Sequence, residues 1–175
     1  MSMVRRALPG DRAKWLELVC EVKDSFPGLD MESYTATLAR NIARGTALCA
    51  FEGEELAGIL LFSPRQRCLS CMAVRPDMRR RGVASALVGR MLVLMPAGDV
   101  SVTTFRAGDA KGAAPRALYA RFGFEPAEEL MEFDYPVQRM VLRAERRAGD
   151  GRGDARPDAA QHMEEADGNQ EGRVH

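Results

Sequence analysis

The chain has 175 residues, 46% of them apolar, which is enough to form one core of ordinary domain size. Lysine plus arginine and aspartate plus glutamate number 25 each, so the formal charge is zero and no overall field would draw nucleic acid onto the surface. The two histidines, His162 and His175, lie close to the C-terminus, which argues against a histidine-activated nucleophile and a three-histidine zinc site.

Export and membrane signals are missing from the sequence. The first residues are rich in charge, and the longest apolar runs, 56–62 and 91–97, are far shorter than the roughly 20 residues of a membrane helix. We therefore expect a cytoplasmic protein with no nucleic-acid or membrane partner. Cys68 and Cys71 have the spacing of half a zinc site or of a redox pair, but no second pair accompanies them, so we expect reduced thiols that fill the core and no metal.

The first half of the chain predicts one strand, two helices and a three-stranded meander. A short strand at 4–8 precedes a helix with apolar residues from Trp15 to Phe26, and a second helix at 31–44 ends at Gly45. Apolar runs at 47–51 and 56–62 flank a short polar joint, which is typical of a hairpin, and 68–74 reads as its third strand.

The second half of the chain continues the alternation of predicted strands and helices. A helix begins at Val83 with strong apolar periodicity, and a strand at 100–105 and a helix at 114–122 follow. Two final strands are expected from Phe124 onward and at 136–142. The order of elements, β-α-α-β-β-β-α-β-α-β-β, predicts a mixed α/β sheet.

The composition changes after Leu142. Residues 143–175 contain no Leu, Ile, Phe, Trp or Tyr, so they cannot bury enough apolar surface to offset chain entropy. We therefore divide the chain into a domain at 1–142 and a disordered charged tail at 143–175. Two interpretations of the tail stay open, a solvated extension and a regulatory or partner-binding segment.

The joint between the strand at 68–74 and the helix from Val83 carries the clearest chemical signal. Three arginines, Arg79 to Arg81, and Gly82 stand at the start of a helix, where amide groups lack acceptors and the helix dipole favours an anion. Arginines there are unfavourable for the helix alone, which suggests an anionic ligand. A solvated arginine patch is the competing interpretation, and neither the P-loop nor the dinucleotide-binding motif occurs.

Two motifs resemble the GNAT family of N-acetyltransferases. Arg79-x-x-Gly82-x-Ala84 is similar to that family's acyl-CoA pyrophosphate loop, and the segment 114–126, containing Leu118-Tyr119 and Gly123-Phe124, is similar to its last helix and the strand after it. The resemblance covers about four-fifths of the chain. It implies a GNAT-like mixed, mostly antiparallel sheet with flanking helices, in which the fourth and fifth strands splay apart.

The resemblance also implies roles for particular residues. The backbone of the fourth strand would bind the pantetheine arm of acetyl-CoA, and an N–H near its end would stabilise the oxyanion. The loop and the first helical turn would wrap the pyrophosphate. Tyr119 would be the general acid that protonates the leaving thiolate, although packing beside Phe122 and Phe124 would also explain it. The implied cofactor-binding residues are Met72, Ala73, Val74, Arg79, Arg80, Arg81, Gly82, Val83, Ala84 and Ser85.

The sequence departs from the family pattern in two places. Many members carry a glutamate on the fourth strand, but 68–74 contains no carboxylate, so the general base is left open. The candidates are Asp24, Glu32, Glu132 and Ser70, the last acting through water. The second departure is Gly112, where an asparagine often begins the last helix motif.

We expect an N-acetyltransferase that moves an acetyl group from acetyl-CoA to a primary amine by direct attack through a tetrahedral intermediate. The loop 25–31 and the region 128–135 would choose the acceptor, a small molecule or a peptide, and Asp30 and Glu32 suit a cationic amine. An acyl-CoA-binding sensor or interaction module is the alternative. A second copy of the chain, forming a homodimer, is kept as a candidate partner.

Overall fold

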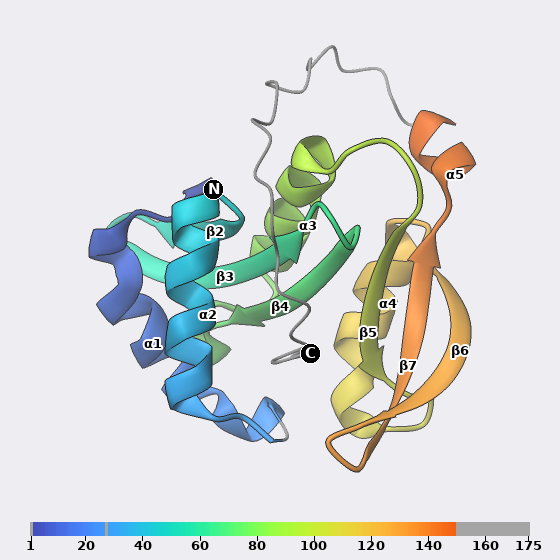
Figure 1. The fold of residues 1–175 in the computed structure, drawn as a ribbon, viewed down its shortest axis with the longest axis horizontal. Helices are drawn as coiled ribbons and strands as arrows, with labels where there is room; N and C mark the ends of the chain where they lie inside the picture. Colours follow the sequence, from blue (N-terminus) through green and yellow to red (C-terminus); the bar gives the residue numbers. More distant parts are fainter. Residues whose placement is uncertain (1, 27, 150–175) are drawn as a thin grey trace.

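The computed structural model describes residues 2–26 and 28–149 of the chain, and its described strands form one seven-stranded sheet (Figure 1). The spatial order is β1-β2-β3-β4-β5-β7-β6, and every neighbouring pair is antiparallel except β4 and β5, which are parallel. The predicted mixed, mostly antiparallel fold is thereby confirmed. The strands are β1 (Met3–Arg6), β2 (Ala47–Glu52), β3 (Glu55–Ser63), β4 (Cys68–Val74), β5 (Val100–Phe105), β6 (Glu125–Glu132) and β7 (Tyr135–Leu142).

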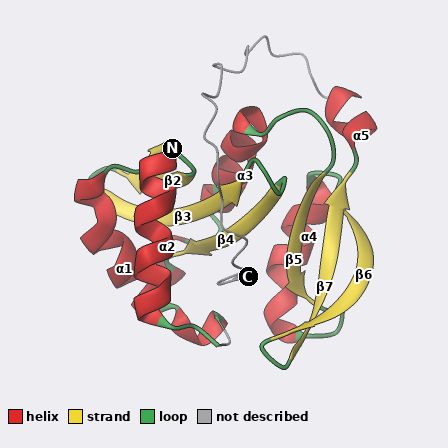
Figure 2. Cartoon of the chain, viewed as in Figure 1, coloured by secondary structure: helices red, strands yellow, loops and turns green. Residues whose placement is uncertain are grey.

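Four helices cover the two faces of the sheet (Figure 2). α1 (Arg12–Glu21) and α2 (Met31–Arg44) pack on one face, and α3 (Val83–Leu94) and α4 (Ala113–Arg121) pack on the other. Each face has its own apolar core, built around Trp15 and Leu38 on the first and around Leu87 and Met91 on the second. A short helix, α5 (Ala144–Gly149), follows β7.

Both cores meet at β3, which explains its unbroken apolar run. Leu60 and Phe62 face α3, whereas Ile59 and Leu61 face α1 and α2, so both sides of the strand are buried. A strand buried on two faces has no need for polar alternation.

Helix α2 begins and ends where its sequence predicts. Asp30 caps it by accepting a hydrogen bond from the backbone N–H of Glu32 at 3.2 Å, and Gly45 ends it in the left-handed region at a φ of 72°. These two ends fix the bounds Met31–Arg44.

The first elements are shorter than predicted. The first strand ends at Arg6, because Asp11 accepts the Leu8 N–H at 2.7 Å and turns the chain into a 3-10 turn at Pro9–Asp11. The first helix ends at Glu21, and a second 3-10 turn, Lys23–Ser25, carries the chain to the buried Phe26. Helix α5 lies at the start of the segment for which the sequence predicts disorder, and the rest of that segment, 150–175, lies outside the described residues.

Candidate active site

The sheet opens between β4 and β5. Only two residue pairs join these strands, Cys68 with Ser101 and Leu69 with Val102. The opening begins at a β-bulge: the register of β4 on β3 passes from Leu69 to Cys71, so Ser70 is the extra residue. We call the unpaired stretch beyond Leu69 and Val102 the split; it lies between the labelled arrows of β4 and β5 in Figure 1.

One edge of β4 is therefore free along the split. Met72, Ala73 and Val74 pair with β3 on their other edge, and the described residues offer them no strand partner on the side of β5. Unpaired strand edges are ready to bind an extended ligand through backbone hydrogen bonds. These are the residues from which the family resemblance predicts backbone contacts to the cofactor arm.

The loop after β4 forms an anion-binding corner. Gly82 begins α3 in the left-handed region at a φ of 78°, Arg80 also has a positive φ, of 63°, and the first turn of α3 has neither an acidic residue nor a side-chain cap. Amides in such a turn that lack acceptors bind anions well. Arg79, Arg80 and Arg81 are exposed, and no ion pair joins them to another described residue.

Gly58 on β3 lets α3 lie close behind this corner. A Cβ at Gly58 would be 2.7 Å from Cγ1 of Val83 and 3.2 Å from the carbonyl oxygen of Ala73. Only glycine therefore lets the first turn of α3 approach β3 and β4 this closely. Sequence reasoning missed this residue, because its only signal was a glycine inside an apolar strand.

Tyr119 lies on α4 and packs in the core that also holds Leu69 of β4 and Val102 of β5. Its side chain is 1% exposed, its ring centroid lies 5.7 Å from that of Phe124, and its hydroxyl makes no hydrogen bond to another described residue. Burial raises the pKa of Tyr119 well above its ordinary value. The phenol therefore keeps its proton in the folded protein and is a weaker acid than a free tyrosine.

A buried hydrogen-bonded chain lies on the β4 side of Tyr119. The indole Nε1 of Trp15 donates to Oη of Tyr34 at 2.9 Å, and that hydroxyl lies 3.5 Å from Sγ of Cys71. Burial raises the pKa of Cys71 to about 12, so its thiol stays protonated. Cys71 is a core residue and not an activated nucleophile.

Arg116, which sequence analysis did not single out, holds α4 in place. Its Nη1 donates to the carbonyl oxygen of Phe105 at 3.1 Å and to Oε1 of Gln138 at 2.8 Å. These bonds tie the helix that carries Tyr119 to the end of β5 and to the middle of β7. The same region explains the departure at Gly112, where a Cβ would lie 2.8 Å from Cβ of Phe105.

The four candidate bases lie in different places. Ser70 stands at the bulge where the split begins, and it is half-buried. Asp24 and Glu32 are exposed, in the turn after α1 and in the first turn of α2. Glu132 ends β6 and is half-buried. Thus Ser70 is the one candidate among them that belongs to the split itself.

The two segments expected to choose the acceptor touch each other. A Cβ on Gly28, in the loop between α1 and α2, would lie 2.8 Å from Cγ of Phe133, in the turn between β6 and β7. The contact joins the β4 half of the sheet to the β5 half. Among the described residues we find no cluster of metal-ligating side chains and no helix long and apolar enough to cross a membrane.

Comparison with known proteins identifies the family and the fold. The family model described as "Acetyltransferase (GNAT) family" matches residues 15–124, from α1 to the end of the segment around Tyr119. The chain belongs to the GNAT acetyltransferase family. A search of curated proteins found no match.

Solved structures of GNAT proteins share the fold at low sequence identity. A Bacillus cereus GNAT acetyltransferase is 20% identical, with a TM-score of 0.68, over 82% of this chain and 97% of that one. The PaiA N-acetyltransferase of Thermoplasma acidophilum, solved with coenzyme A, is 15% identical, with a TM-score of 0.63, over 82% and 99%. A Salmonella typhimurium protein, solved with its cofactor acetyl-CoA, is 16% identical, with a TM-score of 0.62, over 90% and 98%.

Proposed function

We propose that this GNAT protein transfers an acetyl group from acetyl-CoA to a primary amine. The observation that carries the proposal is the free edge of β4, which leads directly into the arginine-flanked start of α3. The buried phenol of Tyr119, in the core that lies against β4 and β5, supports it. The structures solved with coenzyme A and acetyl-CoA support this choice of donor.

Each part of the site has its own role in the proposed reaction. The amides of the first turn of α3 and the three arginines hold the diphosphate, and the edge at Met72–Val74 takes the pantetheine arm. The amine nitrogen attacks the thioester carbonyl, a backbone N–H near Val74 stabilises the oxyanion, and the C–S bond breaks. Tyr119 gives its proton to the leaving thiolate. The amine proton passes to water held by Ser70 or to one of the three carboxylates.

Direct attack suits this site better than an acyl-cysteine route. Cys71 is fully buried, its pKa is raised to about 12, and Tyr34 shares a hydrogen bond with it. Forming a thioester on that sulfur would require a thiolate that the site disfavours. This argues against an acetyl-enzyme on Cys71 and favours a single transfer to the amine.

The role of Tyr119 predicts the effect of Tyr119→Phe. Since general acid catalysis contributes about 10²- to 10⁴-fold, kcat should fall by roughly that factor, while the Kd of acetyl-CoA should change less than about twofold. Steady-state rates and calorimetric titration measure the two effects. Thr46→Val is the control, because it removes a hydroxyl that bonds Asn41 at the C-terminal end of α2, away from the split. Equal turnover in wild type and Tyr119→Phe would refute the role.

The arginine corner predicts a selective loss of affinity. Replacing Arg79, Arg80 and Arg81 together with glutamine should raise the Kd of acetyl-CoA at least about tenfold at low salt, because their charge attracts the phosphates. Acetyl-pantetheine, which lacks the diphosphate, should bind both proteins equally. Arg90→Gln, farther along α3, is the control. A similar loss for both ligands would mean that the loop had unfolded.

The missing carboxylate on β4 favours a second candidate, an acyl-CoA-binding sensor or interaction module with little catalysis. The two candidates differ in one measurement. Thermal stabilisation by acetyl-CoA, together with no acetyl transfer to a broad panel of amines, would favour the sensor.

A further inference from the structure

We propose that Thr104 is a positioning residue for Tyr119: its buried hydroxyl donates a hydrogen bond to the phenol oxygen of Tyr119 as that phenol gives up its proton. This inference rests on the acetyl transfer proposed above and on Tyr119 as its general acid. It concerns the part of β5 that borders the split, along which α4 lies in Figure 1.

Thr104 carries a buried hydroxyl without a partner. Its side chain is fully buried, and Oγ1 forms no hydrogen bond with another described residue. This arrangement is unfavourable, because the hydroxyl has lost its hydrogen bonds to water and has gained none in exchange. A valine would fill the same place without that cost, so the hydroxyl at this position calls for an explanation.

The strand pairing determines which way the hydroxyl points. Val100 and Val102 belong to the core under α3 and α4, and β5 pairs with β7 without a bulge, so Thr104 faces the same side of the sheet. Its partner across the ladder, Gln138, faces that side too, because its Oε1 accepts a hydrogen bond from Arg116 of α4. Thr104 also lies beyond the last pair that joins β4 to β5, so it borders the split.

Tyr119 lies at a similar level along the strand. The first half of α4 is bonded to Phe105, the last residue of β5. Gly123, just after α4, lies close to Leu142, which pairs with the first residue of β5, so the helix runs along β5 in the opposite direction. Tyr119 stands between these two ends, and helical side chains tilt back toward the N-terminus, which directs its buried ring toward the level of Thr104.

The proposed reaction leaves a negative charge on Tyr119. When the C–S bond breaks, the phenol proton passes to the thiolate sulfur, which becomes the thiol of coenzyme A, and a phenolate oxygen remains. Burial, which raises the pKa of Tyr119, makes this phenolate unfavourable, and no described residue donates a hydrogen bond to it. A hydroxyl donor beside that oxygen stabilises the charge as it develops. The phenolate then regains a proton from solvent, in balance with the proton that the amine nitrogen releases.

Thr104→Val tests the proposal, because it removes the hydroxyl and keeps a branched side chain. We expect kcat to fall at least about tenfold and the Kd of acetyl-CoA to stay within about twofold. Thermal unfolding should occur at the same temperature or higher, since a buried unpaired group is lost.

Thr104→Ser retains the hydroxyl and should recover most of the wild-type kcat. A residue that only fills space would give the opposite order, because serine leaves a cavity that valine fills. That order would overturn the proposal.

A double-mutant cycle tests whether Thr104 acts through Tyr119. In the Tyr119→Phe background, which has no phenol to stabilise, Thr104→Val should change kcat less than about twofold. Thr103→Val is the matched control, because Thr103 is also buried but faces the other side of the sheet. Its effect on kcat should be the same with and without the phenol.

The outcomes separate this inference from the proposed function. If Tyr119→Phe lowers kcat and Thr104→Val does not, or if Thr104→Val lowers kcat equally in both backgrounds, the role of Thr104 fails alone. If Tyr119→Phe turns over as fast as wild type, the general acid and the role of Thr104 fail together, while acetyl transfer stands. Binding of acetyl-CoA with no transfer to any amine would overturn the proposed function as well.

Discussion

At the scale of single residues, Asp11 shows how one carboxylate joins two elements. Its oxygens accept two hydrogen bonds from Arg5 on β1, at 2.7 and 2.9 Å, and one from the Leu8 N–H. The bond from Arg5 is the largest cause that lowers the pKa of Asp11 below its ordinary value, and the Leu8 bond adds to it. The folded protein therefore stabilises the charged form of Asp11.

The lowered pKa of Asp11 determines how the stability of the fold depends on pH. A lowered pKa in the folded state stabilises the fold above the ordinary value near 4, and that stability is lost as the pH falls through the lowered value. Asp11→Asn should lower the free energy of unfolding by about 1–2 kcal/mol at pH 7, allowing for the partial exposure of Arg5. Urea denaturation at pH 7 and pH 3 should show the difference shrinking in acid. Glu17→Gln, on the exposed side of α1, should show neither effect, and a difference that stays constant with pH would contradict the assignment.

At the scale of elements, α3 depends on how closely it approaches β3. Gly58→Ala should lower the free energy of unfolding by about 1–3 kcal/mol, because its Cβ would overlap Val83 and meet the Ala73 carbonyl oxygen. It should also weaken acetyl-CoA binding, since the first turn of α3 would move. Urea denaturation and calorimetric titration measure the two changes.

Gly89, which lies in α3 itself, should respond to alanine in the opposite way from Gly58. A Cβ there would meet nothing within 4 Å, so Gly89→Ala should raise stability by about 0.5–1 kcal/mol through helix propensity. Acetyl-CoA affinity should not change. If both alanine variants behaved alike, close approach would not be what distinguishes Gly58.

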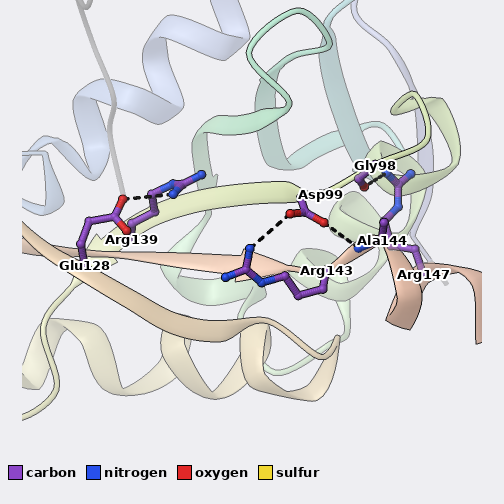
Figure 3. Close-up of polar contacts among 7 residues, drawn as sticks. All are labelled: Gly98, Asp99, Glu128, Arg139, Arg143, Ala144 and Arg147. Carbon is purple, nitrogen blue, oxygen red and sulfur yellow. Dashed lines mark hydrogen bonds and ion pairs between the residues drawn. The ribbon is translucent and has the colours of Figure 1, made fainter.

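At the scale of the whole molecule, α5 ties the end of the sheet to α3 and to the loop that follows it. Figure 3 shows the contacts of Arg147 with Gly98 and of Asp99 with Ala144. Arg147 donates to four backbone carbonyl oxygens near the C-terminus of α3, and Asp99 accepts the Ala144 N–H at 2.8 Å. Of the four acceptors, Leu92 lies in the last turn of α3, whose carbonyls lack helical partners, and the other three follow the helix. One side chain therefore completes the end of the helix whose other end forms the arginine corner.

Arg147→Ala should accordingly lower the free energy of unfolding by about 1–3 kcal/mol. Arg143 gives the comparison, because its pair with Asp99 at 3.2 Å is exposed on both sides. Arg143→Ala should cost less than about 1 kcal/mol. Thermal and urea denaturation of the two variants would separate a carbonyl-capping role from a surface ion pair, and equal losses would show that Arg147 does no more than Arg143.

The sequence predicts which helices and strands occur better than it predicts where each one ends or where each strand lies in the sheet. Helix α2 and strands β4 and β5 have the predicted bounds, since turn residues or sharp changes in polarity flank them. The predicted length of the first helix is too great, because Phe26 fits the apolar spacing of a helix but is buried by a 3-10 turn. The position of this residue therefore indicates burial and not helix. The place of β7 between β5 and β6 depends on long-range pairing that no local pattern reveals.

The candidate site also has features that the sequence predicts and features that only the structure reveals. The arginine corner could be predicted because amides, dipole and charge all lie within a few consecutive residues. The bulge at Ser70, the close approach at Gly58 and the contact between Gly28 and Phe133 each depend on how two segments pack together, so they needed the structure. The general base belongs to this second class, because the family position for it is empty and three of its four candidates lie on segments other than β4.

The two pairs that join β4 to β5 have a consequence for how the protein unfolds. Among the described strands, only this short parallel ladder continues the backbone hydrogen bonding from the β1–β4 half of the sheet to the β5–β7 half, although the core under α3 and α4 holds side chains of both halves, such as Leu60 and Val102. A ligand arm lying along β4 would act as an eighth, borrowed strand and couple the unfolding of the two halves more tightly. The donor molecule would then be part of the architecture as well as of the chemistry.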